Sequence, residues 1–508
     1  MEKVPEKMDS EVPQYFGKGG RLKKSPHPAL IASAYEHECS DTPILLEHLH
    51  DVDIAHGIAL IEAGVVPSPH DKALLKGLLD LKAIPESEFP LRPELGDLYN
   101  SKDTFLREKI GDVAGWIHCG RPRREALNLA FVLATRARFL ELANAHAALA
   151  RTFLNAAEKF KQVYMTDFTY MHPAHPTSLG HYLMTFLFPI LRDFERLQRY
   201  FEKLNRCCAG SGSSNGSALP FKRQRIAELL GFESVSTHTR DSMWQPDVPI
   251  EGMTVLNCLT MNLSRLGEEF QIWTTPPYSL VDFDDGLFRA SVIMPQKRNP
   301  YPMAYVRGLT GWLSGQMASF TALGKTYSGN PDSRIFIYGD LPRATEKTIQ
   351  AVTLFDAILS TMKPDSDAMQ ANVDRSFGEA TELAEALMRT NGVDYRITHQ
   401  IVGAIAAQLA EGGLSKSDIS PELIAEISTN IVGTPVQIDK TQLSKALDTK
   451  SIVESRTETG GAAPVEVQRM IDEAATELDQ VQRWIKAQED RITAANARFE
   501  EACKGITS

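Results

Sequence analysis

Several common features are scarce or absent in this chain of 508 residues, and each absence excludes a class of protein. There are only six cysteines, and their spacing forms neither a disulfide framework nor a C-x-x-C metal-binding pair, which indicates reduced thiols. No apolar run reaches about 18 residues, so we expect no membrane span and no membrane partner. The charged start, from Met1 to Lys7, contains no signal-peptide core, and we therefore expect a cytoplasmic protein.

Net positive charge and cofactor motifs are lacking as well. The formal net charge is −11 at pH 7, which argues against non-specific binding of nucleic acid. A small anionic substrate remains compatible with this charge, because a local cluster of Arg and Lys can still bind carboxylates. The chain has neither a P-loop nor a G-x-G-x-x-G motif in a βαβ pattern, so we expect no cofactor.

Long helical segments dominate the middle of the chain. Residues 124–164 run for about forty positions without Pro or Gly, which is far longer than an ordinary globular helix. Four more long helices are expected at about 178–206, 250–273, 300–327 and 341–362, and little of this region alternates like a strand. Pro189 predicts a kink in one of them. The pattern predicts an all-α protein with an elongated central bundle of five long helices.

The flanking regions differ from this bundle, and we expect three domains. An N-terminal domain of short helices spans 1–117, the central long-helix bundle spans 118–363, and a small C-terminal helical domain of shorter helices spans 364–508. Some central helices are apolar around most of their circumference, as the residues from Leu127 to Leu133 illustrate. Such a helix must be buried on every side, which predicts an oligomer, unless a large monomer buries the same faces internally.

The segment Ser291-Val-Ile-Met-Pro-Gln-Lys-Arg-Asn-Pro300 is the most informative in the chain. Its prolines disfavour a regular helix and predict a constrained loop that displays Ser291, Lys297 and Asn299. Its composition alone is also compatible with an ordinary surface loop before a helix. The order of the residues resembles the signature loop G-S-S-x-M-P-x-K-x-N-P of the fumarase/aspartase superfamily, with Ala290 in place of the Gly and Val292 in place of the second Ser. This resemblance implies that Ser291 is the catalytic base.

A second cluster precedes the longest predicted helix and contains His118 and several arginines. Arginine contacts carboxylates in a bidentate manner, and a helix N-terminus adds positive potential, although a solvated basic turn is the simpler interpretation. The segment resembles H-T-G-R-S-R-N-D, which binds substrate carboxylates in argininosuccinate lyases. The resemblance implies substrate-binding roles for His118 and Arg123. Pro122 and Arg124 depart from the family's Ser and Asn. Arg124 adds a positive charge there, so it is a further substrate-binding candidate, for an extra carboxylate on the amine portion.

A third cluster, Thr169-Tyr-Met-His-Pro-Ala-His-Pro, is rich in histidine. The intervening prolines would scatter these rings, so we expect no metal site. The stretch resembles the argininosuccinate lyase sequence T-H-x-Q-x-A-Q-P, which implies that Thr169 binds substrate. Tyr170 stands where that family has its usual catalytic His, so we assign the general acid to Tyr170, with His172 as the alternative. Tyr99 replaces a family His in the same way and is a further substrate-binding candidate.

Three more segments extend the resemblance to the C-terminal part of argininosuccinate lyases: 380–383, 399–403 and 456–464. In this superfamily the active site combines segments of three chains of a homotetramer with a twenty-helix core. We therefore expect a homotetramer in which the segments near 118–125, 169–176 and 291–299 meet at sites shared by three chains.

These resemblances predict a carbon–nitrogen lyase that eliminates fumarate from an N-substituted aspartate. Ser291 would remove a proton beside a carboxylate, and Lys297 and Asn299 would stabilise the resulting dianion. The departures at the amine side predict an altered amine, such as that of an aminopolycarboxylate like ethylenediamine disuccinate. Two alternatives remain: a superfamily lyase or cycloisomerase with different bond chemistry, and a catalytically silent homologue.

Overall fold

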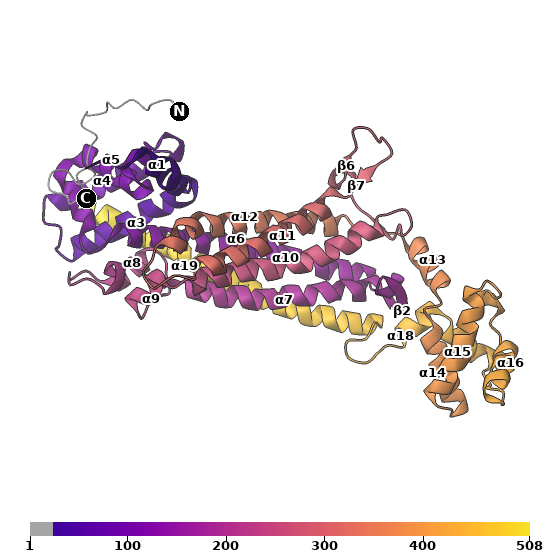
Figure 1. Cartoon of the computed structure of the whole chain (residues 1–508). Coiled ribbons are helices and arrows are strands. Elements are labelled where there is room, and N and C mark those ends of the chain that lie inside the picture. The colour runs from indigo at the N-terminus through magenta and orange to yellow at the C-terminus, as the bar shows by residue number, and fades with distance from the viewer. Residues whose placement is uncertain (1–23, 508) are drawn as a thin grey trace.

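The computed structural model describes residues 24–507, so the first residues of the expected N-terminal domain lie outside the described part of the chain. The molecule is elongated and almost entirely helical (Figure 1), which confirms the predicted all-α class. Its body is a bundle of the five long central helices that the sequence predicts. These are α6 (Arg123–Phe160), α7 (Leu179–Leu204), α10 (Asp247–Trp273), α11 (Tyr301–Leu323) and α12 (Asp332–Ser360).

Helix α6 is the axis of this bundle. It begins where the carbonyl of Pro122 accepts the first amides, and it continues for 38 residues without Pro or Gly. At about 1.5 Å per residue it is about 57 Å long. Within one chain it packs against α7, α12, the N-terminal helix α3 (Thr42–Glu62) and the last helix α19 (Pro464–Thr507). Its apolar residues, such as Leu127 and Leu129, are therefore buried within the single chain. At this helix no partner chain is needed to cover them.

Helix α11 differs because one of its faces has no cover in the single chain. Small residues line this face, and a Cβ added at Gly308, Gly311 or Gly315 would contact no atom. The rings of Tyr305 and Trp312 are exposed on the same helix. Small residues allow helices to approach closely, and exposed apolar surface on a central helix indicates a partner. The exposed face that indicates an oligomer therefore lies on α11 and not on α6.

Prolines do not interrupt two of the long helices. Helix α7 continues through Pro189, and α12 contains Pro342. The expected start of α12 near residue 341 is wrong for this reason, since the helix begins at Asp332.

Shorter helices flank the bundle at both ends. The N-terminal group packs around buried leucines such as Leu49 and Leu78, and it includes α1 (Pro28–Leu30), α2 (Glu36–Cys39), α3, α4 (His70–Lys82) and α5 (Leu98–Ile110). Two more short helices, α8 (Arg223–Leu229) and α9 (Thr239–Trp244), lie near this end. At the other end are α13 (Ser366–Ser376), α14 (Ala380–Asn391), α15 (Tyr395–Ala410), α16 (Pro421–Val432), α17 (Lys440–Ala446) and α18 (Thr449–Glu454).

The segment 364–508 divides between two cores. Apolar residues of α14 to α17 form a separate cluster that includes Leu383, Leu387, Ile401 and Ile424. Helix α19 instead contributes residues such as Val467 and Leu478 to the main core, and it packs along α6 and α7. It has 44 residues, so the expectation of only short helices beyond residue 363 is wrong.

Within residues 24–507, strand is confined to four two-stranded pairs. The antiparallel hairpin of β1 (Tyr164–Thr169) and β2 (His172–Ser178) follows α6, and the antiparallel pair β6 (Arg289–Ala290) and β7 (Arg298–Asn299) closes the loop that starts at Ser291. The other pairs are β3 (Arg206–Cys207) with β4 (Ser234–Val235), which is parallel, and β5 (Val281–Asp282) with β8 (Lys363–Pro364), which is antiparallel. Among residues 24–507, no helix has the length and apolar character needed to cross a bilayer.

Candidate active site

The β6–β7 loop presents Ser291, Lys297 and Asn299 on one narrow protrusion, which Figure 1 shows standing away from the bundle. Its base is held by Asn299, whose side-chain amide donates to the carbonyl of Arg289 at 2.8 Å. Inside the loop, the amide of Met294 donates to Ser291 Oγ at 3.2 Å, and the amide of Lys297 donates to the carbonyl of Met294 at 3.1 Å. The loop is thus constrained, as the sequence predicted, and a backbone donor already points at the Ser291 oxygen.

The tip of this loop is apolar and faces solvent in the single chain. Val292 is fully exposed, and 83% of the Ile293 surface is accessible. Exposed branched aliphatic residues at a loop tip indicate a surface that another chain or molecule covers. The loop therefore has the properties of a segment that acts on something outside its own chain.

The β1–β2 hairpin carries the third cluster. Its two-residue turn consists of Tyr170 and Met171, whose φ angles of 56° and 61° both lie in the left-handed region. Non-glycine residues rarely adopt this conformation, and such strain is concentrated at functional sites. The Tyr170 side chain is 98% exposed, and Thr169, His172 and His175 on the flanking strands are also exposed. The hairpin therefore directs the Tyr170 phenol away from its own chain.

The second cluster lies at the opposite end of α6 and is largely paired within one chain. His118 lies between two partners: its Nε2 is 2.8 Å from Asp103 Oδ1, and its Nδ1 is 3.2 Å from the hydroxyl of Tyr99. Tyr99 is buried, and this burial raises the pKa of its hydroxyl, so it remains a hydrogen-bond donor at neutral pH. In this chain Tyr99 supports His118 from behind rather than facing solvent.

The two arginines that begin α6 have different surroundings. The Arg123 guanidinium lies 3.4 Å from Asp97 and keeps 39% of its side chain exposed. Arg124 makes two contacts with the Glu38 carboxylate, at 2.8 and 3.2 Å, and is mostly buried. Arg123 can therefore still receive an external carboxylate, whereas the charge of Arg124 is neutralised by Glu38.

A third arginine, Arg121, has a structural role. It is buried and contacts Asp53, which also pairs with the buried Lys102. Burial alone would raise the pKa of Asp53, but the two cations lower it to about 2. This buried ion cluster fixes the segment 118–125 on α3 and α5.

The buried Glu125 organises the neighbouring glycine- and serine-rich loop. Its carboxylate accepts the amide of Gly210 at 2.5 Å and the hydroxyl of Ser211 at 2.8 Å. Further along the loop, the Arg240 guanidinium donates to the hydroxyl of Ser214 and to the carbonyl of Ser328. The start of α6, this loop and the turn near 325–331 are therefore connected at one end of the molecule.

The residues of each predicted cluster lie close to one another. The three clusters themselves lie far apart within one chain. Arg123 begins α6 and the β1–β2 hairpin follows its end, so about 57 Å of helix separates them. The Ser291 loop lies near the hairpin end of the bundle and protrudes on a different side (Figure 1). No single chain can form a site from all three.

Sequence analysis missed the acidic partners of the second cluster. Glu38, Asp97 and Asp103 pair with Arg124, Arg123 and His118 respectively. Asp97 also caps α5 by accepting the amide of Asn100, and an Asp just before a helical run is a signal that the sequence contains. Within residues 24–507, no group of three or more His, Cys, Asp or Glu side chains is placed to hold a metal ion.

Comparisons with known proteins agree on one family. Residues 36–315 match the family model described as lyase, and residues 377–454 match the argininosuccinate lyase C-terminal model. Argininosuccinate lyase of Methanosarcina mazei is 31% identical over 87% of this chain and 90% of its own length. The enzyme of Geobacillus thermodenitrificans is 31% identical over 83% of this chain and 91% of its own length.

Solved structures with the same fold include EDDS lyase in complex with formate. It has a TM-score of 0.84 and 24% identity, covering 98% of this chain and 99% of that chain. A variant of EDDS lyase with bound fumarate has a TM-score of 0.85 and 23% identity over the same shares. The 3-carboxy-cis,cis-muconate lactonizing enzyme from Pseudomonas putida is more distant, with a TM-score of 0.68 and 18% identity over 86% of this chain and 95% of that chain.

Proposed function

The chain belongs to the argininosuccinate lyase-like branch of the fumarase/aspartase superfamily and is a carbon–nitrogen lyase, and we propose that it eliminates fumarate from an N-substituted aspartate by a serine-initiated β-elimination. The observation that carries this proposal is the β6–β7 loop. It holds Ser291, Lys297 and Asn299 together with an amide aimed at the serine oxygen.

In the first step, Ser291 removes the proton from the carbon beside a carboxylate of the substrate. A serine hydroxyl has a high intrinsic pKa, and donors that point at its oxygen favour the deprotonated form. The amide of Met294 supplies one such donor, and the exposed Lys297 ammonium on the same loop adds positive charge. Lys297 and free loop amides would then stabilise the dianion that forms on the substrate carboxylate.

In the second step, the amine leaves and must be protonated as the C–N bond breaks. Tyr170 is the proposed acid because the strained turn of the β1–β2 hairpin holds its phenol clear of its own chain. His172 is the alternative, since it is exposed on the next strand and imidazole is the commonest general acid in enzymes. Thr169 and Arg123 are the proposed contacts for the succinyl carboxylates.

These steps require several chains, and the proposed assembly is a homotetramer with each site shared by three of them. About 57 Å of α6 separates Arg123 from the Tyr170 hairpin, so the two must come from different chains. The uncovered face of α11, with Gly308, Gly311 and Gly315, provides a surface on which a second bundle can pack closely. The exposed apolar tip of the Ser291 loop would be covered by a neighbouring chain.

The amine portion of the substrate is proposed to differ from that of argininosuccinate. The Arg124–Glu38 pair places one positive and one negative group beside Arg123, where that family has a neutral amide. Such a pair can exchange partners with an amine that itself carries a carboxylate. An aminopolycarboxylate such as ethylenediamine disuccinate has this character, and EDDS lyase shares the fold.

An ultraviolet assay of fumarate release tests the proposal across a panel of N-substituted aspartates, with argininosuccinate and ethylenediamine disuccinate included. We expect turnover of at least one compound, and a Ser291→Ala loss of about 10²–10⁴-fold with the fold intact. Ser360→Ala, which changes an exposed serine at the end of α12, is the matched control. Activity with argininosuccinate alone would contradict the altered amine. No turnover of any compound would instead favour a cycloisomerase or a catalytically silent homologue.

A further inference from the structure

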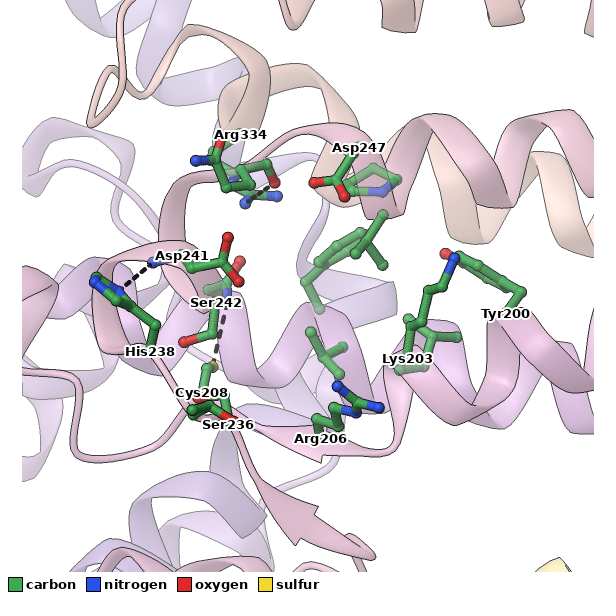
Figure 2. A pocket seen from close by; sticks show the side chains of 18 residues that line it. Tyr200, Lys203, Arg206, Cys208, Ser236, His238, Asp241, Ser242, Asp247 and Arg334 are labelled. Atoms are coloured by element: carbon green, nitrogen blue, oxygen red, sulfur yellow. Dashed lines mark hydrogen bonds between the residues drawn. The ribbon is translucent and has the colours of Figure 1, made fainter.

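One cavity of about 330 Å³ lies between α6, α7, α9 and α10, near the start of α6 (Figure 2). Its lining mixes cations such as Arg206 with carboxylates such as Asp241, and the Tyr200 hydroxyl lies against Gly252. Because this lining favours no single class of ligand, no site is assigned there. The β1–β2 hairpin, at the other end of the bundle, has a more defined relation to its surroundings.

The β1–β2 hairpin has a weak ladder of its own. Pro173 and Pro176 supply no amide to the ladder, and its register shifts between Thr166 and Phe168. The two-residue turn at the tip nevertheless keeps both φ angles in the left-handed region. Such strain persists only where the surrounding structure imposes it. The base and middle of the hairpin must therefore be held by elements outside it.

His181, in the first turn of α7, joins the hairpin to the Gly460 turn, which is the segment 455–463 between α18 and α19. Its Nε2 lies 3.2 Å from the carbonyl of Gly460, and its Nδ1 lies 3.1 Å from the hydroxyl of Thr177 on β2. A carbonyl can only accept, so Nε2 carries a proton and, in the neutral ring, Nδ1 accepts the Thr177 hydroxyl. The Ser178 hydroxyl also accepts the His181 amide at 3.1 Å, which fixes the start of α7. The imidazole therefore links β2 directly to the Gly460 turn.

The Gly460 turn is itself anchored to the C-terminal unit, the helices α14 to α17 with their separate apolar core. Arg456 in this turn pairs with Glu382 of α14 at 3.0 Å. The Arg456 carbonyl accepts the amide of Ala463, and a side chain at Gly461 would collide with the same carbonyl. The turn is therefore tightly closed, and its position follows that of α14.

Two further contacts hold the hairpin from the same part of the chain. Tyr164, which begins β1, donates its hydroxyl to Glu454 of α18 at 3.3 Å. Gly378, between α13 and α14, lies so close to β2 that an added Cβ would be 2.8 Å from the carbonyl of Ala174. Helix α13 packs against both strands. Both strands of the hairpin therefore depend on C-terminal segments for their position.

We propose that His181 is a positioning residue, which holds the Tyr170 hairpin in its reactive orientation by tying β2 to the C-terminal unit. The position of the Gly460 turn is transmitted through the imidazole to Thr177, and along β2 to the turn that carries Tyr170. A displacement of about 1 Å at a reacting group can cost about 10²-fold in rate. The kinetic part of this inference rests on the proposed lyase function, whereas the structural link between the C-terminal unit and the hairpin does not.

Hydrogen exchange measured by mass spectrometry on the full chain tests the structural link without any substrate. In His181→Ala, the amides of β1 and β2 should exchange at least about tenfold faster than in the native protein, because the bridge to Gly460 is lost. The amides of α10 should be unchanged, which shows that the fold is intact. His399→Ala is the matched control. It removes an exposed histidine of α15 whose ring contacts Tyr395 of the same helix, and it should leave the hairpin unchanged.

Kinetics with a compound that the native protein turns over tests the positioning role. His181→Ala should lower kcat by about 10-fold to 100-fold with a smaller change in KM, because the acid is displaced while Arg123 is not. His181→Gln should regain most of the lost kcat, since a glutamine amide can still donate to the Gly460 carbonyl. Gly378→Ala should lower kcat as well, because its Cβ pushes against the Ala174 carbonyl.

Unchanged exchange of β1 and β2 in both His181→Ala and Gly378→Ala would overturn the proposal, whatever the activity of the native protein. A loss of kcat in His181→Ala that His181→Gln does not relieve would also overturn it. If the native protein turns over no compound while the exchange result holds, the lyase assignment fails and the link between the C-terminal unit and the hairpin stands.

Discussion

The candidate catalytic groups at the two ends of the central bundle differ in burial and in ion pairing. At the start of α6, Arg121 and Arg124 are buried against carboxylates, and Tyr99 lies behind His118. At the other end, the Ser291 loop and the Tyr170 hairpin are exposed and have few partners outside their own turns. In the proposed mechanism, the first end receives the charged substrate, and the second carries reactive groups that have nothing to act on within their own chain.

If the proposed mechanism holds, this contrast shows one fold that divides a reaction between two places. The receptor end needs rigid ion pairs, because buried charges must be held in position. The reactive end needs exposure, because its groups must reach a substrate held elsewhere. Disturbing one end at a time, or mixing chains with different defects, tests whether the division is real.

The largest expected effect comes from mixing two inactive variants, Arg123→Ala and Ser291→Ala. If each site takes these residues from different chains, equal random mixing should leave roughly a quarter of the sites with both native groups. Co-expression of the two variants, followed by a fumarate assay, should therefore restore activity that neither variant has alone. Mixing Arg123→Ala with the double variant that carries both Arg123→Ala and Ser291→Ala is the control, because neither partner supplies a native Arg123. Equal recovery there would contradict shared sites.

The next largest effect concerns the receptor end. Asp53→Asn removes the carboxylate that pairs with both Lys102 and Arg121, leaving two buried cations, and should reduce the free energy of unfolding by about 3–5 kcal/mol. Urea unfolding followed by circular dichroism measures this change. Asp112→Asn breaks only the exposed pair with Arg107 and should have an effect below about 1 kcal/mol. Similar unfolding midpoints for the two variants would contradict a rigid receptor end.

The pKa of Asp53 adds a pH dependence with a defined sign. Its folded pKa of about 2 lies below the usual value of about 3.9, so the folded state holds the anionic form more strongly than the unfolded state. The resulting stabilisation is complete above about pH 4 and is lost as the pH falls towards 2. Unfolding midpoints of the native protein should decline over this interval, and the decline should be smaller in Asp53→Asn.

The smallest effect sharpens the assignment of the general acid at the reactive end. Tyr170→Phe removes the phenolic proton but retains the ring, and should lower kcat by about 10²-fold with little change in KM. His172→Gln should have a smaller effect and should leave the pH profile of kcat unchanged. Should His172→Gln instead abolish the fall of kcat on the alkaline side of that profile, the acid would be reassigned to His172.

The long helices of the bundle could be predicted because their signal is local. A run without Pro or Gly and rich in Ala and Leu predicted α6 to within one residue at its start. Its end was predicted too late, because Tyr164 begins β1 instead of continuing the helix. The hairpin was missed because prolines at 173 and 176 mask the alternation of apolar and polar residues in β2. Two strands that pair only with each other also require little of this alternation.

Helix α19 was missed although its sequence contains the signal. Pro464 stands at its first position, and apolar residues recur at helical spacing from Val467 through Leu478 to Ile485. Its return to the main bundle is a tertiary contact that no local pattern encodes. The same applies to the pairing of Arg124 with Glu38, since 86 positions separate these residues in the chain.

Within the candidate site, residue order identified the three clusters but not their surroundings. The Ser291 loop was predicted as a constrained turn, and its internal hydrogen bonds agree with that prediction. The availability of Arg124 was overestimated, because the sequence gives no indication that a carboxylate neutralises it. The distance between clusters follows only from the length and straightness of α6.

The course of α19 has a practical consequence for building with this molecule. Because this helix runs back along the bundle and packs against α3 and α4, its last turns lie beside the N-terminal group of helices (Figure 1). A fluorescent or affinity tag added after the last helix would sit far from the Ser291 loop.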